Sequence, residues 1–179
     1  PELGITQPGI LLCCGDSHTS THGAMGCISF GIGASEASHV LATQSIWQRK
    51  PKLMRVTVTG RLGFGVSGKD VALALIAQES AACGLGYAIE YAGPCIYQLE
   101  IEGRLTLSNM TIEAGSRMGL IGPDEKTIQF LQGSEFAPKG RKWDLAVEAW
   151  KGLPTDEGAE FDKEVTLNGS TIAPMITCC

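Results

Sequence analysis

Residues 10–19 of this chain read ILLCCGDSHT, and they give the first indication of the fold class. Its first four residues are apolar, which is typical of a buried strand, and the polar residues after Gly15 are typical of a short loop. In α/β proteins, the loop that follows a buried strand is the usual place for chemistry. The sequence therefore predicts an α/β fold, with Asp16, Ser17 and His18 as its first candidate functional residues. The alternative is an ordinary polar turn whose side chains cap a helix.

The composition is that of one globular domain or two small ones. The chain has 179 residues, of which 44% are hydrophobic, so a packed core is expected. The formal net charge is −5 and no run of Lys or Arg is present, which argues against a nucleic-acid groove. No apolar run approaches the roughly 18 residues that a membrane span requires. We therefore expect neither nucleic acid nor a membrane as a partner.

The cysteines indicate a reducing compartment. There are seven of them, an odd number, and their spacing does not match a disulfide framework. We therefore expect the cytoplasm, with the mitochondrion as the alternative location. No signal peptide is visible and Pro1 is an unusual first residue, so we interpret the chain as a piece of a longer protein.

Hydrophobic periodicity predicts further strands and helices along the chain. Strands are expected at residues 54–60, 87–91, 98–101 and 120–122, and helices at residues 36–47, 69–83, 106–118, 124–131 and 143–150. Ser35 and Ser67 are the expected N-caps of the first two helices. Asn168-Gly169 lies between two short strand-like runs, which is typical of a β-hairpin. Pro51 ends the first helix and marks the expected boundary between two structural layers.

Asn109 and Glu113 form the second candidate site. They are four residues apart in the predicted helix at 106–118, so they would share one face. Apolar neighbours surround them, so we expect the pair to point into a protected place, where a carboxylate needs a partner. His18 is the obvious partner, because a carboxylate orients an imidazole and favours its charged form. The alternative is the polar face of a surface helix.

The loop at residues 63–69, GFGVSGK, fits the phosphate-loop pattern G-x-x-x-x-G-K. However, Asp70 stands where a Ser or Thr hydroxyl would meet magnesium, and an aspartate there repels phosphate. A tight turn before a capped helix explains the same residues and is the favoured interpretation.

Cys14, His18, His22 and Cys27 are residue types that bind zinc. They converge only if their segment is helical, and its Ser and Thr residues disfavour a helix, so a structural zinc site is not favoured. A nucleophilic pair of Cys14 with His18 is less favoured still, because such partners usually come from distant segments.

Three other ionisable residues have simpler interpretations. His39 lies in the middle of a predicted helix and is interpreted as a packing or surface histidine. Arg104 and Arg117 are candidates to meet an anionic substrate, but an ordinary surface position is the favoured interpretation for both.

Several segments together resemble the aconitase superfamily, and within it the isopropylmalate branch. They read LCCGDSHTSTHGA at residues 12–24, FGIGASE at 30–36, HVLATQ at 39–44, GVSGKD at 65–70, EGRLTLSNMTIEAG at 102–115, GPD at 122–124 and DEGA at 156–159. The resemblance extends over essentially the whole chain, and the motifs occur in the family's order.

The resemblance implies aconitase-type three-layer α/β domains that are only partly present. Residues 1–51 would be the C-terminal part of a first domain, and residues 52–179 a second domain with the start of the next segment. It also implies a [4Fe–4S]-dependent hydro-lyase of leucine biosynthesis. That enzyme isomerises 2-isopropylmalate and 3-isopropylmalate, which are small hydroxy-dicarboxylic acids, by dehydration and rehydration.

By the same resemblance, Asp16, Ser17, His18 and Glu113 are catalytic and Asn109 lines the pocket. Glu113 would pair with His18, and Asp16 would act on a histidine outside this chain. The family's cluster cysteines lie in Cys-Thr-Asn-Ser and Cys-x-x-Cys motifs, which this chain does not contain, so no metal ligand is expected here.

The resemblance places the serine base on a partner, either a small subunit or a C-terminal swivelling domain. The chain alone is therefore expected to be inactive. The alternative is a non-catalytic binding or interaction module that kept the scaffold without the cluster.

Overall fold

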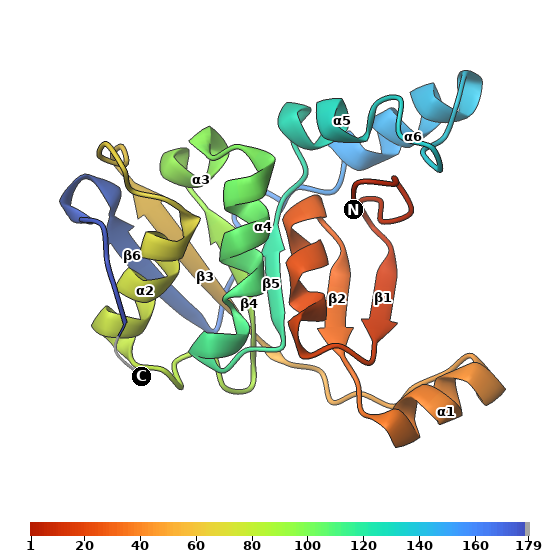
Figure 1. Ribbon diagram of the computed structural model, residues 1–179, viewed down its shortest axis with the longest axis horizontal. Helices are drawn as coiled ribbons and strands as arrows, with labels where there is room; N and C mark the ends of the chain where they lie inside the picture. Colours follow the sequence, from red (N-terminus) through yellow and green to blue (C-terminus); the bar gives the residue numbers. More distant parts are fainter. Residues whose placement is uncertain (178–179) are drawn as a thin grey trace.

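The computed structural model describes residues 1–177, which fold as alternating strands and helices (Figure 1). The strands are β1 (Leu11–Cys14), β2 (Ile28–Gly31), β3 (Lys52–Thr59), β4 (Tyr87–Ala92), β5 (Met118–Ile121) and β6 (Lys163–Asn168). The α-helices are α1 (Ala34–Thr43), α2 (Gly68–Glu79), α3 (Pro94–Gln98), α4 (Ile101–Asn109), α5 (Glu125–Leu131) and α6 (Arg141–Lys151). Three short 3₁₀ segments are η1 (Ser17–Met25), η2 (Ile112–Ala114) and η3 (Gly169–Thr171).

The strands form two sheets. β1 and β2 make a two-stranded sheet, and the other four make a second sheet in the order β5-β4-β3-β6. The strand pairs in both sheets are parallel, which confirms the predicted α/β class. β3 lies inside the larger sheet, and its alternate residues Met54, Val56 and Val58 are fully buried. They share one core with Leu75 of α2 and Leu107 of α4.

Segment η1 joins the two sheets. It follows β1 and packs against both α4 and β5; in Figure 1 it is the orange-red coil between β2 and β5. The approach to β5 requires glycine, because a Cβ on Gly23 would lie 1.8 Å from the carbonyl oxygen of Gly119. Residues on both sides of the expected boundary at residue 51 therefore share an interface. The division into two domains stays a prediction.

Helix α1 differs from the helix predicted at 36–47. It ends at Thr43, and Gln44 takes a left-handed conformation with φ 55°. The N-cap of the helix is Gly33 rather than Ser35, and the backbone N–H of Gly33 donates to Glu36 Oε2 at 2.9 Å. The expected apolar side covers no core, because none of the residues of α1 is buried and Leu41 is 79% exposed. In Figure 1 the helix projects away from both sheets.

Two predicted elements around α4 are wrong. Residues 98–101 are not a strand but the end of α3 and the start of α4, because the segment from Pro94 onward is helical. The predicted helix at 106–118 stops at Asn109, and the chain then turns through η2 into β5. Gly115, with φ 87°, provides the left-handed residue at which η2 ends. Asn109 and Glu113 therefore do not share one helix face.

The hairpin predicted at Asn168-Gly169 is also wrong. β6 pairs in parallel with β3, and Asn168 Oδ1 caps the following 3₁₀ turn by accepting from the backbone N–H of Ser170 at 3.1 Å. Gly169 serves close packing, since a Cβ there would lie 2.5 Å from Cys95 Sγ. The same two residues thus end a strand instead of reversing it.

Helix α2 begins as predicted, with Ser67 at its N-cap, but it ends at Glu79, before the predicted end at residue 83. Asp70 is 1% exposed and accepts hydrogen bonds from the backbone N–H groups of Ser67 and Met175, each at 2.7 Å. Lys69 Nζ lies 2.8 Å from the Asp70 carboxylate and also donates to the Met175 carbonyl. The lysine of the phosphate-loop pattern is therefore engaged by the protein itself.

The carboxyl group of Asp70 is expected to make stability depend on pH. Burial by itself raises its pKa, but hydrogen bonds from Lys69, Met175 and Ser67 outweigh burial and hold the pKa well below its usual range. A carboxylate whose pKa is lowered by folding stabilises the protein above its unfolded pKa of about 3.9, and this contribution is lost as pH falls through the folded pKa.

We therefore expect Asp70→Asn to lower the free energy of unfolding at neutral pH by about 1–3 kcal/mol. The variant is also expected to lose less stability than the unsubstituted chain between about pH 5 and pH 2. Urea unfolding across this range measures both effects. Asp156→Asn, at an exposed aspartate, is the matched control. The prediction would be contradicted if the free energy of unfolding depended on pH equally in Asp70→Asn and in the unsubstituted chain.

No helix within residues 1–177 combines the length and the hydropathy needed to cross a bilayer.

Candidate functional site

The loop after β1 and the segment after α4 meet through His18 and Glu113. His18 Nε2 lies 3.1 Å from Glu113 Oε1, and the two residues are 95 positions apart in the chain. Both side chains remain accessible, with exposed fractions of 38% and 44%. The structure thus brings together the imidazole and the carboxylate that the sequence pairs, although Glu113 lies in η2 rather than in a long helix.

Asp16 and Ser17 set the position of the His18 ring. Asp16 caps η1, because its Oδ1 accepts from the backbone N–H of His18 at 2.9 Å. The Ser17 hydroxyl lies 3.0 Å from His18 Nδ1. Both ring nitrogens therefore have a partner within the chain, and the plane of the ring is held between them.

These contacts define how protons are arranged along the row Glu113–His18–Ser17. An ionised Glu113 only accepts hydrogen bonds, so Nε2 carries the hydrogen that points to it. In a neutral ring Nδ1 then accepts from the Ser17 hydroxyl, and in a protonated ring Nδ1 donates to that oxygen. The arrangement can pass a proton to or from a group that contacts Ser17.

Asn109, at the end of α4, holds this loop in place. Its Nδ2 donates to Thr21 Oγ1 at 2.9 Å, and the Thr21 hydroxyl donates to the His18 carbonyl at 2.6 Å. The half-buried Asn109 side chain therefore supports the backbone that carries His18. The structure places it beside the same site as Glu113, but through Thr21 rather than through a shared helix.

A pocket of about 360 Å³ opens beside Ser17. Its lining residues are Gly15, Ser17, Gly31, Ile32, Ile112 and Arg117. It lies where the parallel strands β1 and β2 end, which is the usual position for ligands in α/β proteins. For Arg117 the favoured interpretation from the sequence is an ordinary surface position. Arg117 is indeed exposed, but it lines this pocket.

Arg104 is not the surface arginine expected from the sequence. Its side chain is fully buried and binds Asp124 with two hydrogen bonds, of 2.8 and 2.6 Å. Burial by itself raises the pKa of Asp124, but the contacts with Arg104 and with the start of α5 outweigh burial and lower it. Arg104 is a structural residue that a ligand does not reach.

The zinc interpretation finds no support in the geometry. Within residues 1–177 no group of three or more His, Cys, Asp or Glu side chains is arranged to hold a metal ion. Cys27 is buried, and burial raises the pKa of its thiol to about 12. His22 binds the Thr6 hydroxyl at 2.9 Å, and burial lowers its pKa. Residues 178 and 179, both cysteines, lie outside the described part of the chain.

Comparison with known proteins gives consistent matches over the whole chain. The model of the aconitase family (aconitate hydratase) matches residues 1–179. The 3-isopropylmalate dehydratase large subunit 1 of Bradyrhizobium diazoefficiens is 55% identical over 177 residues, covering 99% of this chain and 37% of that protein. The 3-isopropylmalate dehydratase large subunit of Roseiflexus castenholzii is 54% identical over 177 residues, covering 99% of this chain and 38% of that protein. The chain thus spans less than two fifths of the length of these relatives.

Proposed function

This chain belongs to the aconitase family, and from that premise we propose that it is part of a hydro-lyase that interconverts 2-isopropylmalate and 3-isopropylmalate. The reaction would proceed by dehydration and rehydration, as a step of leucine biosynthesis. The contact between His18 and Glu113 is the observation that carries the proposal. The names of the two relatives, both 3-isopropylmalate dehydratase large subunits, support this choice of substrate within the family.

The described residues do not fit a [4Fe–4S] ligand set. Such a cluster needs several cysteine thiolates that converge, and the described part of the chain offers no such group. Cys27 and Cys95 are buried and donate to backbone carbonyls. In our proposal other parts of the parent protein would hold the cluster, which would supply Lewis acidity.

The role that we propose for this chain is to hold and exchange a proton. Removing a hydroxyl group requires a proton to reach its oxygen, and adding water requires one to be taken away. Glu113 binds Nε2 of His18 and keeps the ring in one orientation, which leaves Nδ1 as the exchanging atom. Ser17 contacts Nδ1 and lines the pocket, so a substrate hydroxyl in that pocket lies beside the relay.

Asp16 and Asn109 complete the proposed site. Asn109 supports the loop through Thr21, so we assign it a positioning role as well as a place near the pocket. Asp16 caps η1 with one oxygen, and we retain it as a catalytic carboxylate toward a histidine elsewhere in the parent protein.

The proposed partners follow from the same family. The relatives are named large subunits, which supports a small subunit as the partner that carries the serine base, with a swivelling C-terminal domain as the alternative. The substrate class is a small hydroxy-dicarboxylic acid. The five described cysteines are free, which supports the cytoplasm as the location.

The proposal is tested by assaying the complete parent protein together with its small subunit. We expect either isomer of isopropylmalate to be converted to the same equilibrium mixture, measured by chromatographic separation of the two isomers. The 179-residue chain alone is expected to show no conversion. A folded complete protein that carries a cluster and converts neither isomer would contradict the proposal and favour the non-catalytic module.

A further inference from the structure

Arg117 is held in a fixed position at the wall of the pocket. Its Nη2 donates to the Gly31 carbonyl at 2.5 Å and its Nη1 donates to Gln48 Oε1 at 3.2 Å. Its guanidinium carbon lies 5.3 Å from the centroid of the Phe30 ring, and Phe30 is itself buried. A side chain held from three sides loses little further freedom when it binds a ligand, so less of the binding energy is spent on ordering it.

The guanidinium group still has capacity for an anion. Among the ion pairs of residues 1–177, none involves Arg117. Two of its five N–H groups are used by Gly31 and Gln48, which leaves the others for a ligand. Arginine matches the planar geometry of a carboxylate, which it binds through two parallel hydrogen bonds.

The rest of the pocket suits the body of a small organic acid. Arg117 is the only charged residue among those that line it, and Ser17 contributes a hydroxyl on the side of His18. Ile32 and Ile112 supply apolar surface to the same pocket. The combination of one cation, one hydroxyl and an apolar wall is selective for a carboxylate attached to a short aliphatic group.

We propose that Arg117 binds a carboxylate group of the hydroxy acid and so places its hydroxyl beside Ser17, with the aliphatic part against Ile32 and Ile112. This assignment rests on the proposed function, because that function explains why an acid should lie next to the His18 relay. Arg117 is thus a substrate-positioning residue. It is distinct from Arg104, whose guanidinium is buried and already paired with Asp124.

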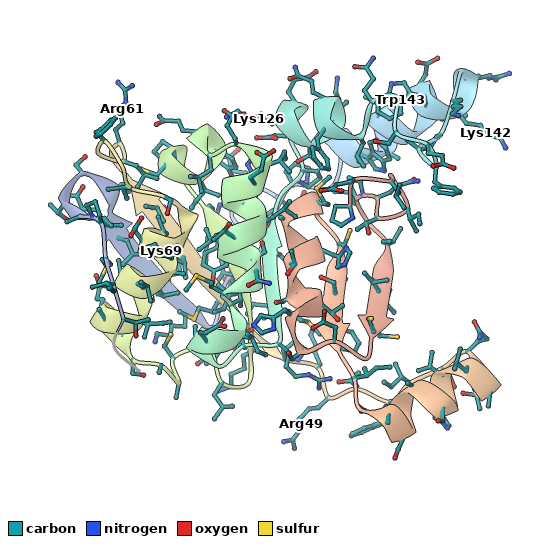
Figure 2. The ribbon with its side chains drawn as sticks, viewed as in Figure 1. Arg49, Arg61, Lys69, Lys126, Lys142 and Trp143 are labelled. Atoms are coloured by element: carbon teal, nitrogen blue, oxygen red, sulfur yellow. The ribbon has the colours of Figure 1, made fainter. Side chains whose placement is uncertain are left out.

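The first test is kinetic and uses the complete parent protein with its small subunit. We expect Arg117→Met to raise KM for isopropylmalate about tenfold or more while kcat changes less than about threefold, because a charged hydrogen bond to the bound acid is lost. Arg117→Lys is expected to restore part of the loss, since it keeps the charge but not the paired geometry. Arg61→Met is the matched control, because Arg61 points away from the molecule at the opposite end from α1 (Figure 2).

The second test measures binding without turnover. Isopropylsuccinate has the two carboxylates and the aliphatic group but no hydroxyl to eliminate, so its Kd can be measured by calorimetry. We expect Arg117→Met to weaken it about tenfold and Arg61→Met to leave it unchanged. Thermal melting of each variant shows whether it is folded, and Arg117→Lys provides the comparison should Arg117→Met be unstable.

The outcomes separate this assignment from the proposed function. An active parent enzyme whose KM and isopropylsuccinate Kd are unaffected by both Arg117 substitutions would overturn the role of Arg117 and leave the function intact. An inactive parent protein that still binds isopropylsuccinate through Arg117 would overturn the function and support the role of Arg117.

Discussion

Replacing His18 with glutamine is expected to lower the kcat of the proposed isomerase by about 10²–10⁴-fold. Glutamine retains hydrogen-bonding groups toward Ser17 and Glu113, but it does not take up or release a proton near neutral pH. The loop itself should survive, because Asp16 caps it through the backbone N–H of His18 and not through the ring. Rates of isomer interconversion measured with the parent protein and its small subunit test this expectation.

Two further variants show whether the loss comes from the relay. Glu113→Gln is expected to reduce kcat as well, and the double variant should be little worse than His18→Gln alone, because the two side chains act as a unit. His39→Gln, in the exposed helix α1, is the matched control and should leave kcat unchanged. If the effects of the His18 and Glu113 substitutions multiply independently, the two residues do not work through their contact.

Replacing Arg104 with methionine is expected to lower the free energy of unfolding by about 3–5 kcal/mol. Besides its two hydrogen bonds to Asp124, Arg104 donates to the carbonyl groups of Leu99 and Tyr97. Its removal takes the charged partner from the partly buried Asp124 carboxylate and one donor each from the Leu99 and Tyr97 carbonyl groups, and breaking a buried ion pair costs more than the pair contributes. Urea unfolding at neutral pH measures the loss.

A second substitution distinguishes the loss of the pair from the loss of volume. The double variant Arg104→Met with Asp124→Leu removes both charges and is expected to recover part of the stability that Arg104→Met loses. Recovery will be incomplete, because Asp124 also caps α5 through the backbone N–H groups of Lys126 and Thr127. Arg141→Met, at an exposed arginine, is the control. A loss below about 1 kcal/mol for Arg104→Met would contradict a structural role for the buried pair.

The two arginines show why residue type alone does not reveal function. Arg104 and Arg117 were interpreted alike from the sequence, yet one is fully buried against Asp124 and the other lines the pocket beside Ser17. The difference arises because Arg104, in α4, is buried against Asp124 at the start of α5, whereas Arg117 immediately precedes β5 and donates to Gly31 at the end of β2. No local pattern in the sequence carries this information.

Elements with strong local signals were predicted well. β3 alternates apolar and polar residues, and α2 begins at a serine followed three residues later by an aspartate, so each can be recognised within its own segment. The errors lie where a tertiary partner overrides a local pattern. Asn168-Gly169 is a typical sequence for a hairpin turn, but β6 pairs in parallel with β3. Glycine is required at position 169 because Cys95 packs closely against it.

Four features can be predicted from the amino-acid sequence alone: the α/β class, the polar loop after the first strand, the resemblance to the aconitase family and the pairing of His18 with Glu113. These features depend on short sequence patterns and on the order of the motifs, both of which can be read from the sequence. Three others emerge only from the folded chain: the two side chains lie 3.1 Å apart, Asn109 acts through Thr21, and Arg117 rather than Arg104 lines the pocket. These features depend on burial and contact, which are set by how segments distant in the sequence pack together. Here that packing rests on the close approach of Gly23 to Gly119, which brings the loop after β1 against α4 and β5.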